Sequence, residues 1–515
     1  MLSDAPIRSF LADFEALVAR DPEAPACVDE NSTILSYGAF DDLIDRMLAY
    51  INGLGLGKGS TLLALMPNAV ETALVFLACL KGGLRFAPLP CTASAAEITS
   101  AANLTGAQFI LIADPVPNRV VQQLALLTVP IRRIETGTDL SWIPADKPKS
   151  KPGAGQLIIT TSGSTGAAKA ILIDGDRLWS SGHAFMDFHG LIGARCRFWN
   201  YLPMSYLGGL FNLCLIPLVT GGSFVIGEAF SGKTMLSFWD TVVRFDIDSL
   251  WMVPAIVRGL TSLADRAGKP KRTPPIKICF LGTAPIRLAE KTKFRDLFGI
   301  EMLENFALSE TTFLTSEVAT TQRVESGTGA ILPYIQMKLL PVERDDDGRA
   351  TDSSEIAVKS PFMMLGYMTE GGKVDATLDV EGFLRTGDLG KFEQGQLVIT
   401  GRTKDIVKKG GYLILLPEVE HLAAAHPDVQ EAVAVPCAHP FFGESYILFV
   451  RLNNDTGDAA AESSALAEIR GWVQDGLARH KWPERIQLHR EFPRTRSGKI
   501  MKHALAAEIT AAASS

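Results

Sequence analysis

The stretch Thr160–Ala170, TTSGSTGAAKA, concentrates small hydrogen-bond donors around one lysine. Ser and Thr hydroxyls and unhindered Gly amides donate hydrogen bonds, and Lys169 adds a positive charge. Such a stretch is suited to binding an oxyanion, above all a phosphate group. Its composition is also that of a polar linker, so the flanking elements must decide between the two interpretations.

Apolar runs flank this stretch on both sides. The pattern predicts a strand at 156–161 before it and another at 169–174 after it, with a helix only beyond the second strand. A Walker-type loop needs GxxxxGK[ST] leading directly into a helix, whereas here two glycines and the lysine are spaced three residues apart. The glycine-rich run 53–60 precedes a strand instead of following one, which does not fit the dinucleotide fingerprint. Neither of these common nucleotide-binding motifs is supported.

Strand and helix patterns alternate along most of the chain. Short apolar runs at 61–66, 109–113, 249–253 and 276–282 predict buried strands, and a longer helical pattern such as 69–83 lies between two of them. Alternation of this kind implies parallel sheets that helices cover on both faces. The predicted fold class is therefore α/β.

The sequence changes character after about residue 400, where a glycine-rich basic turn precedes a compact mixed unit. The expected elements are strands at 431–437 and 445–452, an amphipathic helix at 464–480 and an exposed loop at 453–464. The chain exceeds the size of a single hydrophobic core. We therefore predict a large N-terminal domain, 1–402, and a small, mobile α+β C-terminal domain, 403–515.

Composition and charge narrow the class of partner. Hydrophobic residues make up 47% of the 515 residues and charged residues 21%, as in globular proteins. The formal charge of −7 argues against extended contact with nucleic acid. The uncharged stretch 201–227 is long enough to cross a membrane. Because prolines and glycines divide it, we expect a buried helix followed by a strand and no membrane span.

The cysteines and the N-terminal segment favour the cytoplasm. The seven cysteines stand singly without a CxxC pair, which indicates neither a disulfide framework nor a zinc site. The first twenty residues alternate charged with apolar residues, a pattern that predicts a helix and not a signal peptide.

Five further motifs follow the Thr160–Ala170 stretch. They are ENFALSETT (304–312), EIAVKSPFMMLGY (355–367), FLRTGDLG (383–390), ITGRTKDIVKKGGYLILLPEVE (399–420) and PRTRSGKIMK (493–502). In order and spacing, the set resembles the acyl-adenylate-forming superfamily of acyl-CoA synthetases, adenylation domains and firefly luciferase, over nearly the whole chain. The resemblance implies an enzyme that makes an acyl-AMP from a carboxylic acid and Mg-ATP and then passes the acyl group to a thiol.

The resemblance also implies how the nucleotide is held. The residues that would wrap its phosphates are Thr161, Ser162, Gly163, Ser164, Thr165, Gly166 and Lys169. Phe306 would stack on adenine, Ser309 would contact the nucleotide, and Glu310 would be a carboxylate ligand of Mg²⁺, a hard cation that prefers oxygen. Asp388 would take the ribose hydroxyls and Arg402 would support the same sugar and phosphate. Lys499 would offset charge at the α-phosphate in the transition state.

Two departures from the family's pattern concern the acyl pocket. The family usually has Tyr-Gly where this chain has Phe306-Ala307, and Tyr206 replaces a frequent aromatic residue or histidine. Ala307 adds a methyl group where glycine often floors the pocket, which indicates a shallower or reshaped pocket. The implied pocket positions are Tyr206, Gly208, Gly209, Gly282, Thr283, Ala284 and Ala307. The stretch 201–209 lacks an acidic residue for a substrate ammonium, which disfavours an amino acid and leaves aryl, short-chain and medium-chain acids open.

The thiol acceptor and the domain motion are further implications. VKKGGY resembles the glycine turn that lines the pantetheine tunnel, with Lys409, Gly410 and Gly411, and Lys404 matches the hinge of the C-terminal domain. A ligase without a fused carrier favours coenzyme A over the phosphopantetheine of an acyl carrier protein. A luciferase-like oxygenase would share every motif, whereas a non-catalytic relative would be expected to lack Lys499 or Glu310.

Overall fold

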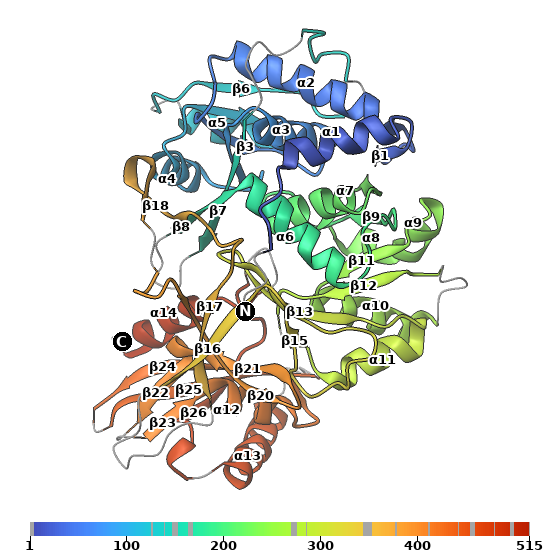
Figure 1. Cartoon of the computed structure of the whole chain (residues 1–515). Helices are drawn as coiled ribbons and strands as arrows, with labels where there is room; N and C mark the ends of the chain where they lie inside the picture. Colours follow the sequence, from blue (N-terminus) through green and yellow to red (C-terminus); the bar gives the residue numbers. More distant parts are fainter. Residues whose placement is uncertain are drawn as a thin grey trace. The chain divides into compact units, whose positions relative to one another are not determined.

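The computed structural model describes residues 5–513 except 125–126, 138–139, 147–152, 163–167, 269–274, 285, 343–352, 376–377, 410–411, 441, 454–458, 478 and 495–498. The chain forms two compact units (Figure 1). The first unit comprises residues 1–323, 328–336 and 359–378, and the second comprises 324–327, 337–358 and 379–515. The second unit includes segments before residue 402, because the strands in these segments pair with one another. The boundary at 402, predicted for the mobile C-terminal domain, stays a prediction.

The first unit contains an eight-stranded sheet in the order β19-β18-β8-β7-β4-β3-β5-β6. Its strands are β3 (Thr61–Leu65), β4 (Arg85–Leu89), β5 (Phe109–Ile112), β6 (Ile131–Arg133), β7 (Gln156–Ser162), β8 (Ala168–Asp174), β18 (Gly366–Thr369) and β19 (Lys373–Asp375). The strands from β7 to β6 run parallel, and β8, β18 and β19 add antiparallel pairs at the other edge. At this edge β8, which carries Lys169, pairs with β18 from a much later part of the chain.

A nine-stranded sheet completes the first unit in the order β15-β14-β13-β12-β11-β9-β10-β1-β2. Its strands are β1 (Pro25–Val28), β2 (Ile34–Ser36), β9 (Arg197–Asn200), β10 (Ser223–Ile226), β11 (Ser249–Met252), β12 (Ile278–Leu281), β13 (Leu303–Leu308), β14 (Thr312–Ser316) and β15 (Ala330–Ile331). The central strands are parallel and β13, β14 and β15 form antiparallel pairs. The β13–β14 hairpin carries the ENFALSETT motif.

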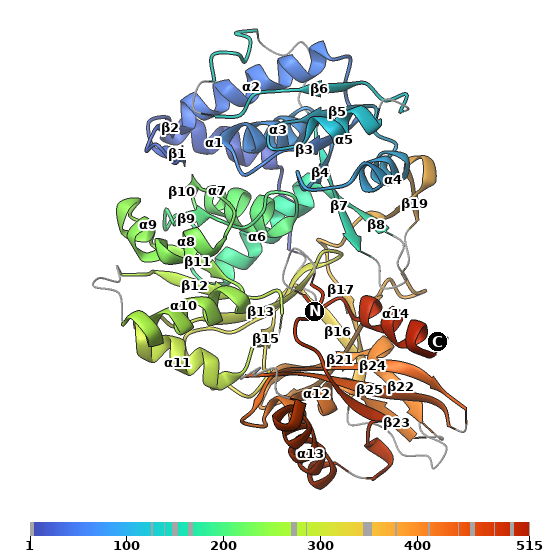
Figure 2. The same ribbon diagram turned by 180° about the vertical axis from the view of Figure 1, so that it is seen from behind.

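Helices separate most of these strands, as the alternating pattern predicts. They are α1 (Phe10–Arg20), α2 (Tyr37–Gly53), α3 (Val70–Lys81), α4 (Ala95–Thr105), α5 (Asn118–Gln123), α6 (Gly175–Phe188), η2 (Gly208–Leu215), α7 (Ile216–Val219), α8 (Gly232–Leu236), α9 (Phe238–Arg244), α10 (Pro254–Ala267), α11 (Leu288–Phe298) and the short η3 (Glu370–Gly372). Every residue of α3 is buried, because the helix is mostly apolar and packs against α2, β4, β7 and η2. Figure 1 and Figure 2 show α4 beside the edge that β18 and β19 form, and α4 contacts β18.

The second unit contains two smaller sheets. One has the order β16-β17-β20-β21, and the other has β23-β22-β25-β24 with β26 beside β25. The strands are β16 (Gln336–Pro341), β17 (Ser354–Lys359), β20 (Leu384–Glu393), β21 (Gln396–Arg402), β22 (Ile406–Lys409), β23 (Tyr412–Leu415), β24 (Val429–His439), β25 (Gly443–Leu452) and β26 (Arg485–Leu488). The helices are α12 (Leu416–Ala424), α13 (Ala459–Gly476), α14 (Lys502–Ala513) and the short turns η4 (Thr403–Asp405) and η5 (Arg479–Lys481).

The predicted α/β class, with parallel-rich sheets and a smaller α+β unit, is confirmed. The uncharged stretch 201–227 is buried at most positions and forms helix followed by strand, although η2 is a π-helix. The loop predicted at 453–464 is wrong in its second half, because α13 already begins at Ala459. Alanines there favour helix over loop. Among the described residues, none of the helices combines the length and the apolar content that a membrane crossing requires.

Candidate active site

The phosphate-binding candidate is the turn between two strands, as its flanking patterns predict. Thr161 lies opposite Lys169 in the β7–β8 register, and Ser162 lies opposite Ala168. Gly163, Ser164, Thr165 and Gly166 lie outside the described residues. Lys169 is exposed. The helix α6 begins only after β8, with Asp174 accepting a hydrogen bond as its N-cap, so this turn lacks the strand-to-helix geometry of a Walker loop.

The hairpin of β13 and β14 brings the central motif from the core to the surface. Glu304 and Asn305 are buried at the start of β13, whereas Ala307 is exposed and Phe306 is half-buried. A bulge between Phe306 and Ala307 interrupts the pairing with β14. Bulges re-aim side chains, so the second half of the strand presents its residues differently from the first.

Glu310 lies in the turn of this hairpin and is half-buried. Its Oε1 accepts a hydrogen bond of 2.9 Å from the hydroxyl of Tyr367, and its backbone oxygen accepts one of 2.8 Å from the N–H of Met364. Burial and the charge of Glu310 raise the pKa of Tyr367, so the phenol is a donor at neutral pH. Tyr367 belongs to a quoted motif, but its role was missed because nothing in the local pattern indicates which carboxylate its hydroxyl meets.

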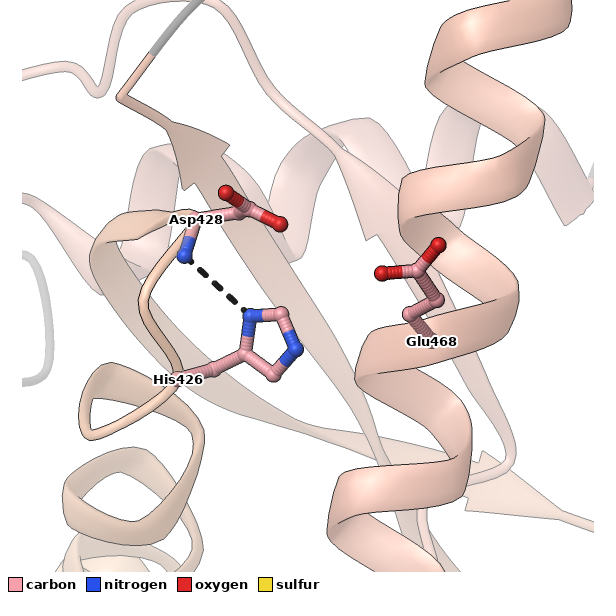
Figure 3. Close-up of side chains that lie close together, drawn as sticks. All are labelled: His426, Asp428 and Glu468. Atoms are coloured by element: carbon pink, nitrogen blue, oxygen red, sulfur yellow. Dashed lines mark hydrogen bonds between the residues drawn. The ribbon is translucent and has the colours of Figure 1, made fainter.

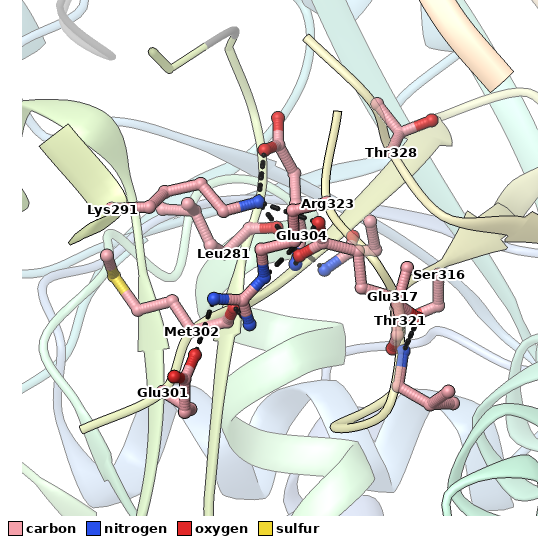
Figure 4. Close-up of polar contacts among 12 residues, drawn as sticks. Leu281, Lys291, Glu301, Met302, Glu304, Ser316, Glu317, Thr321, Arg323 and Thr328 are labelled. Atoms are coloured by element: carbon pink, nitrogen blue, oxygen red, sulfur yellow. Dashed lines mark hydrogen bonds and ion pairs between the residues drawn. The ribbon is translucent and has the colours of Figure 1, made fainter. Parts of the chain in front are cut away.

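A buried ionic network lies at the base of the same hairpin (Figure 4). Nζ of Lys291, on α11, is 2.8 Å from each carboxylate oxygen of Glu317 and 3.0 Å from Oε2 of Glu304. The N–H of Glu304 donates to Oε2 of Glu317 at 2.8 Å, and Nε of Arg323 lies 3.6 Å from Oε1 of Glu317. Lys291 and Glu317 are 3% and 0% exposed, so these charges depend on one another. The network ties α11 to both ends of the hairpin.

The predicted pocket residues are held by close backbone contacts in the first unit. The aromatic ring of Tyr206 lies over Gly208, where an added Cβ would be 2.6 Å from Cε2 of the ring. A Cβ on Gly209 would be 2.4 Å from the backbone oxygen of Pro203. Thr283 has a φ of +83°, which is strained for a β-branched residue and typical of functional loops. The packing therefore requires glycine at Gly209, where the close atoms are backbone, whereas a side chain at Gly208 would need the Tyr206 ring to move.

Gly282 and Ala284 flank the strained Thr283 after β12. A Cβ on Gly282 would be 3.1 Å from Oδ1 of Asn305, whose Nδ2 donates to the backbone oxygen of Leu281 at 2.9 Å. Asn305 thus fastens the segment after β12 to β13, and with it to the strand that carries Ala307. Asn305 was not among the predicted site residues, although it stands next to Phe306 in the motif.

Four predicted charged residues meet in the second unit. Asp388 and Arg402 are register partners on β20 and β21, and Nε of Arg402 is 2.7 Å from Oδ1 of the buried Asp388. Lys499 retains contact with solvent, but the protein around its ammonium group and the charge of Arg402 lower its pKa. Asp388 partly offsets this effect, and Lys404 contributes to it. The proposed ribose, phosphate and catalytic residues are therefore close enough to influence one another.

Of the predicted thiol-channel residues, the structure describes Lys409. Gly410 and Gly411 lie outside the described residues. Nζ of Lys409 donates to the backbone oxygen of Trp482 at 2.7 Å and lies 5.4 Å from the ring centroid of Phe442. Burial lowers the pKa of Lys409. Its ammonium group thus packs within the second unit, and its place in a thiol channel stays a prediction.

A group outside the predicted site has the composition of a metal centre (Figure 3). His426, Asp428 and Glu468 bring ligand atoms to within 4.8 Å of one another. However, the N–H of Asp428 donates to Nδ1 of His426 at 3.2 Å, so the neutral ring carries its proton on Nε2. A metal at Nε2 would displace that proton while Nδ1 still accepts a hydrogen bond. We therefore assign no metal to this group.

Comparison with known proteins identifies the family. The model for the AMP-binding enzyme matches residues 14–368, and that for the AMP-binding enzyme C-terminal domain matches 418–499, so the chain belongs to the AMP-binding enzyme family. It is 28% identical to a sulfoacetate–CoA ligase of Cupriavidus necator over 94% of each chain. It is 24% identical to an oxalate–CoA ligase of Arabidopsis thaliana over 96% of this chain and 97% of the other. ATP-bound MatB from Rhodopseudomonas palustris has a TM-score of 0.83 at 23% identity, covering 96% of this chain and 98% of MatB.

These matches confirm the class inferred from the motifs. The protein is an AMP-forming acid–thiol ligase of the acyl-adenylate-forming superfamily.

Proposed function

We propose that this ligase activates a small carboxylic acid with Mg-ATP and transfers the acyl group to coenzyme A. The observation that supports it most directly is the group of Asp388, Arg402 and Lys499 in the second unit. Lysines near a chain's end are usually solvated. Here Lys499 lies near the two residues that the motifs assign to the ribose and phosphate.

The first half-reaction forms the acyl-adenylate. A carboxylate oxygen of the acid attacks the α-phosphorus of ATP, and the bond from that phosphorus to the bridging oxygen breaks as pyrophosphate leaves with the electron pair. Negative charges gather at one place in this step, so fixed positive groups lower its barrier. Lys499 would supply that charge at the α-phosphate, while Asp388 and Arg402 hold the ribose.

Glu310 would hold the Mg²⁺ of the nucleotide. Its half-buried carboxylate suits a hard cation, and the Tyr367 hydroxyl engages Oε1 and not Oε2. Bound Mg²⁺ would neutralise part of the negative charge on the phosphates. Lys169 and the donors of the β7–β8 turn would contact the same phosphates.

In the second half-reaction the thiol sulfur attacks the acyl carbon, and the bond from that carbon to the AMP oxygen breaks. The C-terminal domain would turn about Lys404 between the two steps, withdrawing Lys499. The similarity to relatives named as CoA ligases supports coenzyme A as the acceptor. The seven free cysteines, five of them buried, support a reducing compartment such as the cytoplasm.

The acid is proposed to be small. The ring of Tyr206 covers Gly208, and Ala307 adds a methyl group where the family often has glycine, so both side chains reduce the space in the predicted pocket. The similarity to ligases named for sulfoacetate and oxalate supports the same size class. Pyrophosphate release should therefore be measured with acetate, propionate, oxalate, sulfoacetate, hexanoate and 4-coumarate, each with and without coenzyme A.

We expect turnover with the two- and three-carbon acids and thioester formation with coenzyme A. Turnover restricted to hexanoate or 4-coumarate would contradict the small pocket. Thioester formation with a holo acyl carrier protein and not with coenzyme A would contradict the proposed acceptor. Asp388→Asn should raise the KM for ATP far more than that for the acid, because the ribose contact belongs to the nucleotide.

A further inference from the structure

Tyr367 contacts two oppositely charged residues of the candidate phosphate site. Its hydroxyl donates to Oε1 of Glu310 at 2.9 Å, and Nζ of Lys169 lies 5.1 Å from the centroid of its ring. The three residues come from different segments, namely β8, the β13–β14 turn and β18. A single side chain therefore binds the anion with its hydroxyl and the cation with its aromatic face.

Strand pairing places the ring beside Lys169. In the antiparallel pair of β18 and β8, Tyr367 lies opposite Ile171. Lys169 is two residues from Ile171 and so projects from the same face, as a diagonal neighbour of Tyr367. The contact is thus a consequence of sheet register and does not depend on the conformation of a loop.

The backbone places the hydroxyl beside Glu310. The segment before β18 is tied to the Glu310 turn by the 2.8 Å hydrogen bond from the N–H of Met364. It is also tied to β8 by the N–H of Leu365, which donates to the backbone oxygen of Leu172 at 2.8 Å. Tyr367 lies two residues after Leu365, the second of these two hydrogen-bonded residues. Its position is therefore determined relative to both charged partners.

We propose that Tyr367 is a positioning residue of the adenylation step. Its hydroxyl holds Oε1 of Glu310 so that Oε2 faces the metal of the nucleotide, and its ring keeps the Lys169 ammonium group beside the phosphates. This inference rests on the proposed function, in which Glu310 binds the metal and Lys169 binds phosphate. Tyr367 itself touches neither the acid nor the reacting phosphorus.

The two contacts have separable effects. A phenol that donates to a carboxylate makes a charge-assisted hydrogen bond, which is stronger than a bond between neutral groups. A lysine over an aromatic face at a solvent-exposed position gains less. Removing the hydroxyl should therefore affect metal-dependent nucleotide binding, whereas removing the ring should affect nucleotide binding with or without metal.

The test uses the full-length protein, calorimetric titration with ATP and with Mn²⁺-ATP, and pyrophosphate release as a function of Mg²⁺. For Tyr367→Phe we expect unchanged affinity for metal-free ATP and about tenfold weaker binding of Mn²⁺-ATP, as for a lost hydrogen bond to a charged group. The Mg²⁺ concentration for half-maximal rate should rise in parallel. Tyr367→Leu should in addition weaken metal-free ATP binding by about threefold, as for a lost cation–π contact.

Tyr334→Phe is the matched control. Tyr334 is buried in the same unit with its ring 5.1 Å from that of Phe362, and its hydroxyl has no hydrogen-bond partner among the described residues. Removal of this hydroxyl should leave both ATP titrations and the Mg²⁺ dependence unchanged. Thermal melts of both Tyr→Phe variants establish that the chains are folded.

The double variant Tyr367→Phe/Glu310→Gln separates this inference from the proposed function. If the hydroxyl acts through Glu310, adding Tyr367→Phe to Glu310→Gln causes no further loss of Mn²⁺-ATP affinity. Wild-type Mn²⁺-ATP affinity in Tyr367→Phe, or an equal loss for metal-free ATP, would overturn the role of the hydroxyl. Unchanged Mn²⁺-ATP affinity in Glu310→Gln would instead overturn the metal role of Glu310, and with it the role given to the hydroxyl. Unchanged ATP affinity in Tyr367→Leu would overturn the role of the ring.

Discussion

Two clusters of charged side chains, one in each unit, differ in their balance of charge and in their exposure. At the base of the β13–β14 hairpin, Lys291 meets Glu304 and Glu317, and all three side chains are almost completely buried. In the second unit, Asp388 pairs with Arg402 in a neighbourhood where further lysines add positive charge. The first cluster pairs a buried cation with two buried carboxylates, whereas the second holds more positive than negative charge near the surface.

This difference indicates a structural role for the first cluster and supports the proposed nucleotide-binding role of the second. Buried opposite charges hold elements in register because breaking one pair leaves an uncompensated charge. In the second unit, burial and neighbouring positive charges lower the pKa of Lys499 and of Lys404, which means that the protonated forms are destabilised. An added anion such as a nucleotide phosphate relieves that repulsion.

The largest predicted effect breaks the buried cluster. Lys291→Met should lower the free energy of unfolding of the first unit by ~3–5 kcal/mol, because two carboxylates lose their shared cation. Lys293→Met is the control on the same helix, since Lys293 pairs with Asp265 where both side chains are about half exposed, and it should cost less than ~1 kcal/mol. Chemical denaturation followed by tryptophan fluorescence measures both values. Equal losses would contradict the structural role of the cluster.

Removing the catalytic candidate from the exposed cluster should affect chemistry and not folding. Lys499→Ala should reduce pyrophosphate release by ~10²–10³, as for the loss of one transition-state contact. Conversion of pre-made acyl-AMP to thioester should stay near the wild-type rate, because thiol attack on the acyl carbon does not need this charge. A parallel fall of both half-reactions, or a lowered melting temperature, would assign Lys499 to structure.

Lys404 tests whether Lys499 moves away from Asp388 and Arg402 between the two half-reactions. Lys404 lies in the 3₁₀ turn η4, a conformation whose φ is compatible with proline. Lys404→Pro should lock this turn, so that pyrophosphate release persists in a single turnover while thioester formation falls at least about tenfold, or ~1.4 kcal/mol in barrier. Lys404→Ala serves as the control. Similar behaviour of the two variants in a folded protein would argue against the hinge.

The smallest predicted effect is a shift in pH dependence. Because the pKa of Lys499 lies below that of an ordinary lysine, about 10.4, its charge is lost at lower pH as the pH rises. The value of kcat/KM for ATP should therefore fall on an alkaline limb that begins below that pH, since this parameter reports the free enzyme. Lys499→Arg keeps its positive charge over this pH range. The alkaline limb in kcat/KM for ATP should therefore be absent in this variant, even if its activity is low. An unchanged limb in this variant would assign the titration to another group.

Local patterns predicted much of the fold and of the site. The strands on either side of the Thr160–Ala170 turn and the helix after Asp174 were predicted correctly, because apolar runs and helix caps depend on residues that are adjacent in the sequence. The first residues of α13 were predicted as a loop, because their run of small and polar residues is also typical of loops. The motifs placed Asp388, Arg402 and Lys499 in one site, and their mutual influence within the second unit agrees with that placement.

The sequence by itself determined the α/β class, the two strands that flank the Thr160–Ala170 stretch and the family, because these depend on residue type and on spacing over short stretches. Only the tertiary structure decided that Tyr367 meets Glu310, 57 residues away, and that Lys291 is the buried partner of Glu317 while Lys293 remains at the surface. These contacts depend on which strands pair and on which face a helix packs. No short stretch of sequence specifies a partner that lies on another strand, so the groups that orient the motif residues become visible only once the chain is folded.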